Sequence, residues 1–266
     1  MTVRNDLDLY DRYGAEWWDE RSPRFRSLHG VNRLRVSLLD EWVGREISGR
    51  RILDLGCGGG LLAEPLALRG AQVVGLDRSG PSLRAGREHA GACHWAPIYL
   101  RGDLMAIPTG EASFDAVLLA DVLEHLVDPA GALLEAARVL RPGGWLYVST
   151  IDRTLRARML VVHLAEGIGL IPRGTHDPKL FIAPRELDEA ATAAGLVRTH
   201  RTGESPDLLQ TLRSRAIRLR RARSTAVAYS VLYRKGETTM LPSGLLKVRI
   251  NSRLPPQAIS VEGDHI

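Results

Sequence analysis

A glycine-rich loop, set between a short apolar run and a helical pattern, limits most strongly what this chain can fold into. Residues 51–55 read Arg-Ile-Leu-Asp-Leu, which is typical of a buried strand, and Gly-Cys-Gly-Gly-Gly follows at residues 56–60. The next residues, 61–69, have the periodicity of a helix. Glycines at such a junction permit tight turns and let a ligand approach the backbone closely. The unit therefore predicts a nucleotide-binding α/β fold.

Apolar runs and helical patterns continue to alternate along the chain. The further predicted strands are residues 71–76, 97–101, 114–120, 145–149, 197–202 and 226–233. The further predicted helices are residues 79–89, 130–140 and 185–194. Strands separated by helices of this length indicate a doubly wound α/β sheet. We therefore expect a Rossmann-like fold with a mostly parallel sheet of seven strands.

The remaining segments define the expected domain organisation of the 266 residues. Residues 1–46 carry two helical patterns, at 5–21 and 27–43, and are expected to form an N-terminal helical cover. Residues 47–236 form the α/β domain, within which residues 154–183 are expected to form a lid. Residues 237–266 lack a firm periodicity and are interpreted as a C-terminal extension.

Cysteine content and the N-terminal sequence bear on the compartment. Cys57 and Cys93 are the two cysteines, which excludes a disulfide framework and, without a CxxC pair, a zinc ribbon. The N-terminus carries charges where a signal peptide needs an apolar stretch. No segment approaches the roughly 20 apolar residues of a spanning helix. A cytoplasmic protein is expected.

Three aspartates at the ends of predicted strands suggest which nucleotide binds. Asp54, next to the glycines, can accept a hydrogen bond from a ligand ammonium group but would repel a pyrophosphate. Asp77 lies 21 residues after Gly56, a spacing that suits a ribose-binding acid. Asp103 follows the third strand, where it could accept from an adenine amino group. These features describe S-adenosylmethionine (SAM), with a dinucleotide oxidoreductase that binds NAD and a purely structural glycine turn as alternatives.

At this point the chain resembles a known family. Its general motifs resemble those of class I SAM-dependent methyltransferases: Asp54-Leu-Gly-Cys-Gly-Gly-Gly60, Gly-Leu-Asp77, Asp121-Val-Leu-Glu-His125 and Leu140-Arg-Pro-Gly-Gly144. More specific motifs are similar to the ubiquinone-biosynthesis O-methyltransferases, the UbiG-like family: Trp17-Trp18-Asp19, Leu28-His29-Gly-Val-Asn32-Arg-Leu-Arg35 and Pro172-Arg-Gly-Thr-His-Asp177. The resemblance covers about residues 8–203.

The resemblance implies SAM contacts at Arg35, Gly56, Asp77 and Ala120. Arg35 would reach from the N-terminal cover to the methionine carboxylate, a role that suits its planar, always charged group. Taken without the family, Arg35 is interpreted as a surface helix residue. The full set expected to bind the cofactor is Arg35, Asp54, Gly56, Gly58, Asp77, Arg78, Asp103, Leu104, Ala120 and Asp121.

The cluster Asp121-Val-Leu-Glu124-His125 follows the fourth strand, at the sheet edge where α/β folds bind ligands. A phenol with a pKa of about 10 needs a base or a metal to lose its proton at neutral pH. Three interpretations stay open. His125, with Glu124, acts as the catalytic base; Asp121, Glu124 and His125 hold Mg²⁺, as the resemblance also implies; or Glu124 and His125 only orient the loop. His29, His163 and His176 are weaker candidates, and His176 could line the acceptor side.

The resemblance implies a phenolic or catecholic acceptor, a polyprenylated ubiquinone precursor of the 3-demethylubiquinol type. A secondary-metabolite phenol methyltransferase and a non-catalytic SAM-binding protein are the alternatives. Residues 155–171 are apolar and carry two arginines, and residues 213–223 are rich in arginine. Both segments could touch an anionic membrane peripherally at its inner face. Without interleaved aromatic residues, nucleic-acid binding is not expected.

Overall fold

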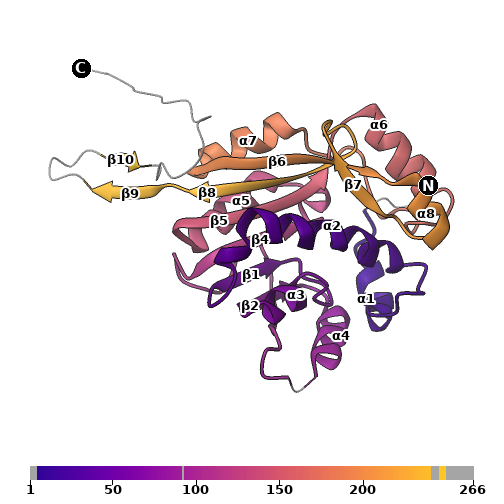
Figure 1. Ribbon diagram of the computed structural model, residues 1–266, viewed down its shortest axis with the longest axis horizontal. Helices are drawn as coiled ribbons and strands as arrows, with labels where there is room; N and C mark the ends of the chain where they lie inside the picture. The colour runs from indigo at the N-terminus through magenta and orange to yellow at the C-terminus, as the bar shows by residue number, and fades with distance from the viewer. Residues whose placement is uncertain (1–4, 92, 241–245, 250–266) are drawn as a thin grey trace.

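The computed structural model describes residues 5–91, 93–240 and 246–249. An eight-stranded sheet in the order β3-β2-β1-β4-β5-β8-β6-β7 forms its centre (Figure 1). The strands are β1 (Arg51–Leu55), β2 (Gln72–Asp77), β3 (Ile98–Arg101), β4 (Phe114–Ala120), β5 (Leu140–Ile151), β6 (Leu196–Pro206), β7 (Leu219–Ala222) and β8 (Ala228–Lys235). The first five pair in parallel and the last three pair antiparallel. The predicted mostly parallel, doubly wound sheet is confirmed.

The prediction of seven strands was one too few. The eighth strand, β7, lies inside the arginine-rich segment and pairs antiparallel with β6 at the edge of the sheet. It is only four residues long, with two arginines at its centre, so its apolar alternation is too weak to detect. The strand predicted at 145–149 is longer in the structure, because β5 begins at Leu140 and contains the Gly143-Gly144 pair.

Helices cover both faces of the sheet. They are α1 (Leu9–Tyr13), η1 (Gly14–Glu16), α2 (Arg26–Val43), η2 (Gly44–Glu46), α3 (Ala63–Leu68), α4 (Gly80–Ala90), η3 (Leu123–His125), α5 (Pro129–Val139), α6 (Leu155–Ala157), η4 (Arg158–Ala165), α7 (Pro184–Ala193) and α8 (Leu208–Ser214). Helix α4 begins where the Ser79 side chain accepts from the Ser82 backbone N–H, and α5 begins at the similar cap of Asp128. These caps explain why both helices begin close to the predicted residues.

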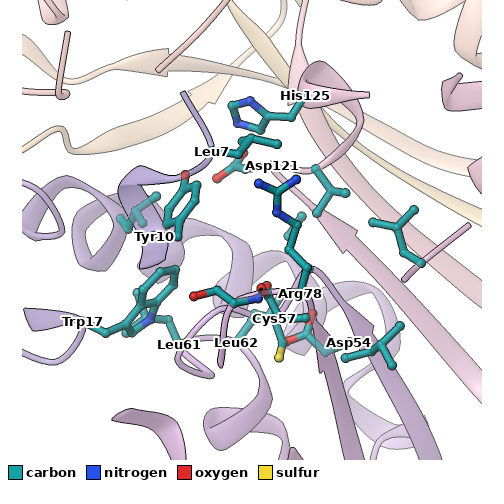
Figure 2. Close-up of a pocket in the computed structure, with 18 of the residues that line it drawn as sticks. Leu7, Tyr10, Trp17, Asp54, Cys57, Leu61, Leu62, Arg78, Asp121 and His125 are labelled. Atoms are coloured by element: carbon teal, nitrogen blue, oxygen red, sulfur yellow. Dashed lines mark hydrogen bonds between the residues drawn. The ribbon is translucent and has the colours of Figure 1, made fainter. Parts of the chain in front are cut away.

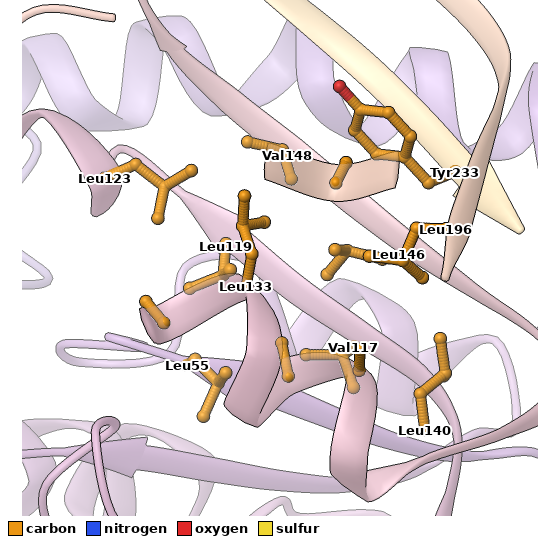
Figure 3. Packing of buried hydrophobic residues seen from close by; sticks show 14 of the residues in the cluster. Leu55, Val117, Leu119, Leu123, Leu133, Leu140, Leu146, Val148, Leu196 and Tyr233 are labelled. Carbon is orange, nitrogen blue, oxygen red and sulfur yellow. The ribbon is translucent and has the colours of Figure 1, made fainter. Parts of the chain in front are cut away.

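Successive residues of the central strands serve the two faces in turn, because side chains alternate along a strand. Leu119 and Val148 lie in the core that β4 and β5 share with α5 and α7 (Figure 3). Leu118 and Tyr147, their neighbours in sequence, lie in a second core with α2 and α3. Strands buried on both sides are typical of parallel sheets, which explains why they appear in the sequence as continuous apolar runs.

The first and last elements described by the structure differ in how they pack against this core. Helices α1 and α2 are the first elements; α1 contacts α4, and α2 packs in the second core. Within the expected C-terminal extension, β9 (Glu237–Met240) and β10 (Leu246–Arg249) pair antiparallel. Residues 241–245 and 250–266 of that extension lie outside the described part of the chain.

Candidate active site

A pocket of about 480 Å³ lies at the carboxyl ends of the parallel strands. Figure 2 shows Asp54 and Cys57 at one end of it, and His125 beside Leu7 and Asp121 at the other. The predicted residues that line it are Arg35, Asp54, Gly56, Asp77, Arg78, Asp103, Leu104, Ala120, Asp121 and His125. Gly58 and Glu124 are not among the lining residues. A pocket of this size with a few convergent polar groups is typical of a small-molecule site.

In the loop between β1 and α3, neighbouring side chains leave no room for a Cβ atom at Gly56 and Gly58. A Cβ on Gly56, whose φ is +68°, would lie 2.5 Å from Val122, and one on Gly58 would lie 2.1 Å from the Trp17 ring. The Gly58 N–H donates to Asp77 Oδ2 over 2.8 Å. Gly58 therefore shapes the loop and supports Asp77, and the structure places it behind the wall that a ligand would meet.

Asp77 ends β2 and has both carboxylate oxygens hydrogen-bonded to backbone N–H groups. Oδ2 accepts from Gly58 and Oδ1 accepts from Ser79, each over 2.8 Å. Burial nevertheless raises the pKa of this carboxyl, although both hydrogen bonds act in the opposite direction. Each oxygen keeps a lone pair, so the fixed carboxylate can still accept from the two hydroxyls of a ribose.

Asp54 lies at the end of the pocket nearest β1 and is 2% exposed. Its Oδ2 atom is buried and has no hydrogen-bond partner among the described residues. Burial, and next the negative charge of Asp77, raise the pKa of Asp54 to about 8. A buried acceptor without a partner is costly for a folded protein, which points to a ligand that supplies the donor. The amino group of SAM fits this requirement.

Arg35 crosses from α2 to the end of β4, where it binds Asp121. Its two terminal nitrogens donate to the two carboxylate oxygens, Nη2 to Oδ1 over 2.6 Å. Asp121 adopts a φ of +55°, which non-glycine residues rarely take. The fully buried Glu204 of β6 lies 4.0 Å from Arg35 Nη2. Because Asp121 occupies the fork of Arg35 in this structure, the contact of Arg35 with the methionine carboxylate stays a prediction.

The other predicted cofactor residues line the pocket from neighbouring loops. Asp103 follows β3, and its Oδ1 atom accepts from the Met105 N–H over 2.9 Å. Leu104 comes next in the same loop, Arg78 follows β2, and Ala120 ends β4. Their location at one sheet edge agrees with an adenosine-binding arrangement, in which parallel strands present side chains at a shared end.

His125 and Glu124, both in η3, have different surroundings. His125 lines the pocket; its Nδ1 lies 2.7 Å from Asn5 Oδ1. Burial, and next the neighbouring His176, lower the pKa of His125 to about 3, so its imidazole is neutral at physiological pH. Glu124 is 1% exposed and accepts from Thr150 Oγ1 over 2.8 Å. Burial raises the pKa of Glu124 to about 8, and its position outside the lining supports no direct contact with a substrate.

The described residues show no metal-binding group that includes Asp121, Glu124 and His125, and the expectation of a Mg²⁺ site there stays a prediction. Across the described residues, no three His, Cys, Asp or Glu side chains come together in a way that could hold a metal ion. Asp121 is bound by Arg35, whereas Glu124 turns toward Thr150 on β5. Hydrogen bonds to Arg35 and Thr150 thus hold two of the three side chains in this structure.

The N-terminal cover contributes to the pocket wall Tyr10 and Trp17, two of the aromatic residues expected to cover a ligand cleft, and also Leu7 and Asn32, which were not predicted as site residues. Trp17 and Trp18 both contact the glycine loop, and Trp18 Nε1 donates to the Gly59 carbonyl over 2.9 Å. The dense aromatic content of residues 10–18 had indicated this cover, because aromatic side chains bury large areas where they pack.

The order of the strands, the glycine loop and the aspartates around it define a class I SAM-dependent methyltransferase. A family described as a methyltransferase domain matches residues 53–148. A ubiquinone biosynthesis O-methyltransferase of Methylocella silvestris is 38% identical over 77% of this chain and 86% of its own length. The corresponding protein of Chromobacterium violaceum is 39% identical over 72% and 82%. The chain belongs to the family of ubiquinone biosynthesis O-methyltransferases.

Solved structures show the same fold at low sequence identity. Magnesium protoporphyrin IX methyltransferase from Synechocystis PCC 6803, with bound SAH, is 20% identical. The match covers 87% of this chain and 95% of that one, with a TM-score of 0.62. A possible histamine N-methyltransferase from Thermotoga maritima is 19% identical, covering 85% and 98%, with a TM-score of 0.60. These structures show the fold, and the family membership given above identifies the chain as a methyltransferase that uses SAM, as its sequence predicted.

Proposed function

We propose that this enzyme transfers a methyl group to the hydroxyl of a phenol or catechol, and that the acceptor is a polyprenylated quinol precursor. The observation that carries the proposal is a buried, neutral His125 in the wall of the pocket that also holds the cofactor-binding aspartates. The names of the relatives, all ubiquinone biosynthesis O-methyltransferases, support this class of acceptor.

The chain's own residues have three tasks in this reaction. SAM supplies a methyl group already activated by the sulfonium, so no further electrophile is needed. Asp54 and Asp77 bind and orient the cofactor, which brings the methyl carbon into line with the acceptor oxygen. His125 takes the phenolic proton as that oxygen attacks. Burial disfavours the imidazolium, but the phenolate formed beside it offsets this cost because opposite charges attract strongly in a buried site.

The walls near His125 suit an aromatic ring with an apolar substituent. Leu7 lies beside His125, Leu126 follows it in the chain, and both line the pocket together with the Tyr10 ring. Burial, and next the charge of Asp121, raise the pKa of the Tyr10 hydroxyl, so Tyr10 stays neutral. Apolar side chains and a neutral Tyr10 in this wall favour a catechol ring that carries an apolar substituent.

The purified enzyme is therefore expected to form SAH from SAM only when a catechol is added. We expect kcat/KM to rise as an alkyl or prenyl tail is lengthened, because each added methylene buries further apolar surface. The measurement is SAH release by chromatography with catechol, a short-tailed demethylubiquinol and NAD as a control ligand. Turnover that falls as the tail is lengthened would instead favour a secondary-metabolite phenol as the acceptor.

We infer a peripheral membrane contact from exposed apolar residues on the lid and on α8. On α8, Leu208, Leu209 and Leu212 are 65%, 68% and 74% exposed. The lid exposes Leu155, Met159, Leu164 and Ile168. No helix in the described ranges is long and apolar enough to cross a membrane. The two segments together are called the apolar edge below.

The lid and α8 lie at the same end of the molecule (Figure 1). Ser27 links the lid to the segment that follows α8, because its hydroxyl donates to the Leu170 carbonyl over 2.6 Å and accepts from the Ile217 N–H over 3.1 Å. The apolar edge is flanked by arginines that are exposed and form no ion pair with another described residue: Arg156, Arg158, Arg213 and Arg215. Exposed leucines beside unpaired arginines match the chemistry of an anionic bilayer surface.

Replacing Leu212 with aspartate is expected to weaken binding to phosphatidylglycerol vesicles about tenfold. The change removes one inserted leucine, worth roughly 1.5 kcal/mol or more, and adds a repelled charge. Vesicle cosedimentation measures the effect. Leu134→Asp, on the exposed face of α5, is the matched control and should bind like the wild type. Equal binding to phosphatidylcholine and phosphatidylglycerol, or equal losses in both variants, would contradict the proposal.

A further inference from the structure

Two hydrogen bonds join Asn5 to His125 although 120 positions separate them. Asn5 Nδ2 donates to the backbone carbonyl of His125 over 3.0 Å, and Asn5 Oδ1 lies 2.7 Å from His125 Nδ1. A carbonyl can only accept, so the amide nitrogen of Asn5 must be the atom that faces it. The amide oxygen consequently faces Nδ1, and an oxygen of this kind can only accept. Nδ1 must therefore carry the proton.

The remaining ring nitrogen follows from this assignment. A neutral imidazole has one N–H, so with a proton on Nδ1 the Nε2 atom carries a lone pair. Nε2 makes no hydrogen bond with another residue of the described chain, and His125 lines the pocket. We propose that Asn5 is a positioning residue that holds His125 in the tautomer whose Nε2 can accept the acceptor's proton. This inference rests on the proposed function of His125 as the base.

The segment that carries Asn5 is fixed at several points. Asn5 has a φ of +63°, a conformation that asparagine tolerates better than most residues. The Asp6 N–H donates to the Gly174 carbonyl over 3.1 Å, which ties the segment to the Gly-Thr-His loop. Asn5 thereby approaches one nitrogen of the His125 ring, and the Gly-Thr-His loop approaches the face of the ring.

The loop itself is organised by the buried Glu166. This carboxylate accepts from the Gly174 N–H over 2.9 Å and from the His176 N–H over 3.1 Å. The His176 ring stacks on the His125 ring with centroids 5.3 Å apart and planes 24° apart. Stacking limits how far the His125 ring can tilt, whereas the two bonds to Asn5 decide which nitrogen is protonated.

The proton balance explains why asparagine suits this position. When Nε2 takes the phenolic proton, Nδ1–H stays hydrogen-bonded to Asn5 Oδ1, and the imidazolium keeps both protons until Nε2 releases one to solvent. The amide cannot accept a proton itself, so the transfer ends on His125. With the tautomer reversed, Nε2–H would face the acceptor hydroxyl, and no lone pair would be available for its proton.

The test compares Asn5→Gly with Asn5→Asp. Glycine accepts the positive φ but removes both side-chain bonds, whereas aspartate keeps an oxygen that accepts from Nδ1–H. We expect Asn5→Gly to lower kcat by about 10- to 100-fold, part of the 10²–10⁴ that a positioned base supplies, with KM and the Kd for SAH within about threefold. Asn5→Asp should recover kcat to within about threefold of the wild type. Asp6→Asn, a change at a half-buried neighbour whose side chain pairs with Arg12, should leave all three constants unchanged.

The ¹⁵N chemical shifts of the His125 imidazole give a readout that does not depend on turnover. The wild type and Asn5→Asp should show a protonated Nδ1 and an unprotonated Nε2, and Asn5→Gly should show a mixture of tautomers. Equal kcat losses in Gly and Asp variants, or a protonated Nε2 in the wild type, would overturn the inference. If His125→Ala kept full turnover, the proposed function would fail instead, while the tautomer shifts could still be as expected.

Discussion

Replacing His125 with alanine is expected to lower kcat by about 10²–10⁴-fold and to leave the Kd for SAH unchanged. The expectation follows from the position of the imidazole. It lines the pocket opposite Asp54 and makes no contact with the cofactor in the proposed arrangement. Loss of a positioned general base removes catalysis of that size. Steady-state turnover and calorimetric titration with SAH measure the two constants separately.

The matched control for His125 is His94→Ala, because His94 is exposed in the loop after α4 and does not line the pocket. This variant should keep the wild-type kcat. An acceptor whose hydroxyl is already ionised should also lose much less activity in His125→Ala, because it needs no base. If both acceptors suffered the same loss, His125 would shape the pocket rather than move a proton.

Asp54→Asn is expected to weaken SAH binding by at least about 30-fold. Removing one partner of a buried charge pair costs about 2–5 kcal/mol, since the ammonium group of the ligand is left without its counter-charge. Calorimetry on the wild type, Asp54→Asn and Glu88→Gln gives the comparison. Glu88→Gln removes the same charge from the exposed side of α4 and should bind SAH normally.

The same carboxyl makes SAH binding dependent on pH. Its pKa of about 8 means that the ligand-free pocket holds a proton at pH 7, and an ammonium ligand must displace it. The Kd is therefore expected to fall by up to about tenfold per unit as pH rises from 6 to 8 and then to level off. Asp54→Asn should show no such slope in this range, and a slope that persists in the variant would assign the proton to another group.

The stability of the ligand-free protein should fall as pH rises, whereas its affinity for SAH should increase. An acid whose folded pKa lies above its unfolded value of about 4 makes the folded state bind more protons, so this group lowers stability as pH rises from about 4 to 8. The ligand-free Asp54→Asn protein is thus expected to have a higher Tm than the wild type at pH 8, with a difference that shrinks toward pH 5. Thermal unfolding checks this result. A variant that gained nothing at pH 8 would show that Asp54 carries no buried charge.

The sequence predicted those features that local pattern and spacing determine. The strand at 114–120 and the glycine loop after 51–55 were predicted at their observed positions, because apolar runs and glycines report directly on burial and backbone geometry. Asp54, Asp77 and Asp103 were found for a similar reason, since the ends of parallel strands meet at one edge.

The sequence could not show contacts that the folded chain alone creates. Asp121, Glu124 and His125 are close in sequence, which suggested a metal set, but the sequence could not show that Asp121 binds Arg35 or that Glu124 accepts from Thr150. Asn5 reaches His125 only because the N-terminal segment returns to the sheet edge. The spacing of residues along a chain does not show which distant segments come into contact in the fold.

The contact between the N-terminal cover and the glycine loop has a consequence for how the pocket can be followed. Trp17 lies against Gly58 and Gly59, while Trp18 holds the Gly59 carbonyl and stacks on His89 with ring centroids 3.5 Å apart. Lifting the cover from this loop moves two indole rings from packed surroundings into water. Tryptophan emission is therefore a built-in optical signal of pocket opening, available without any label.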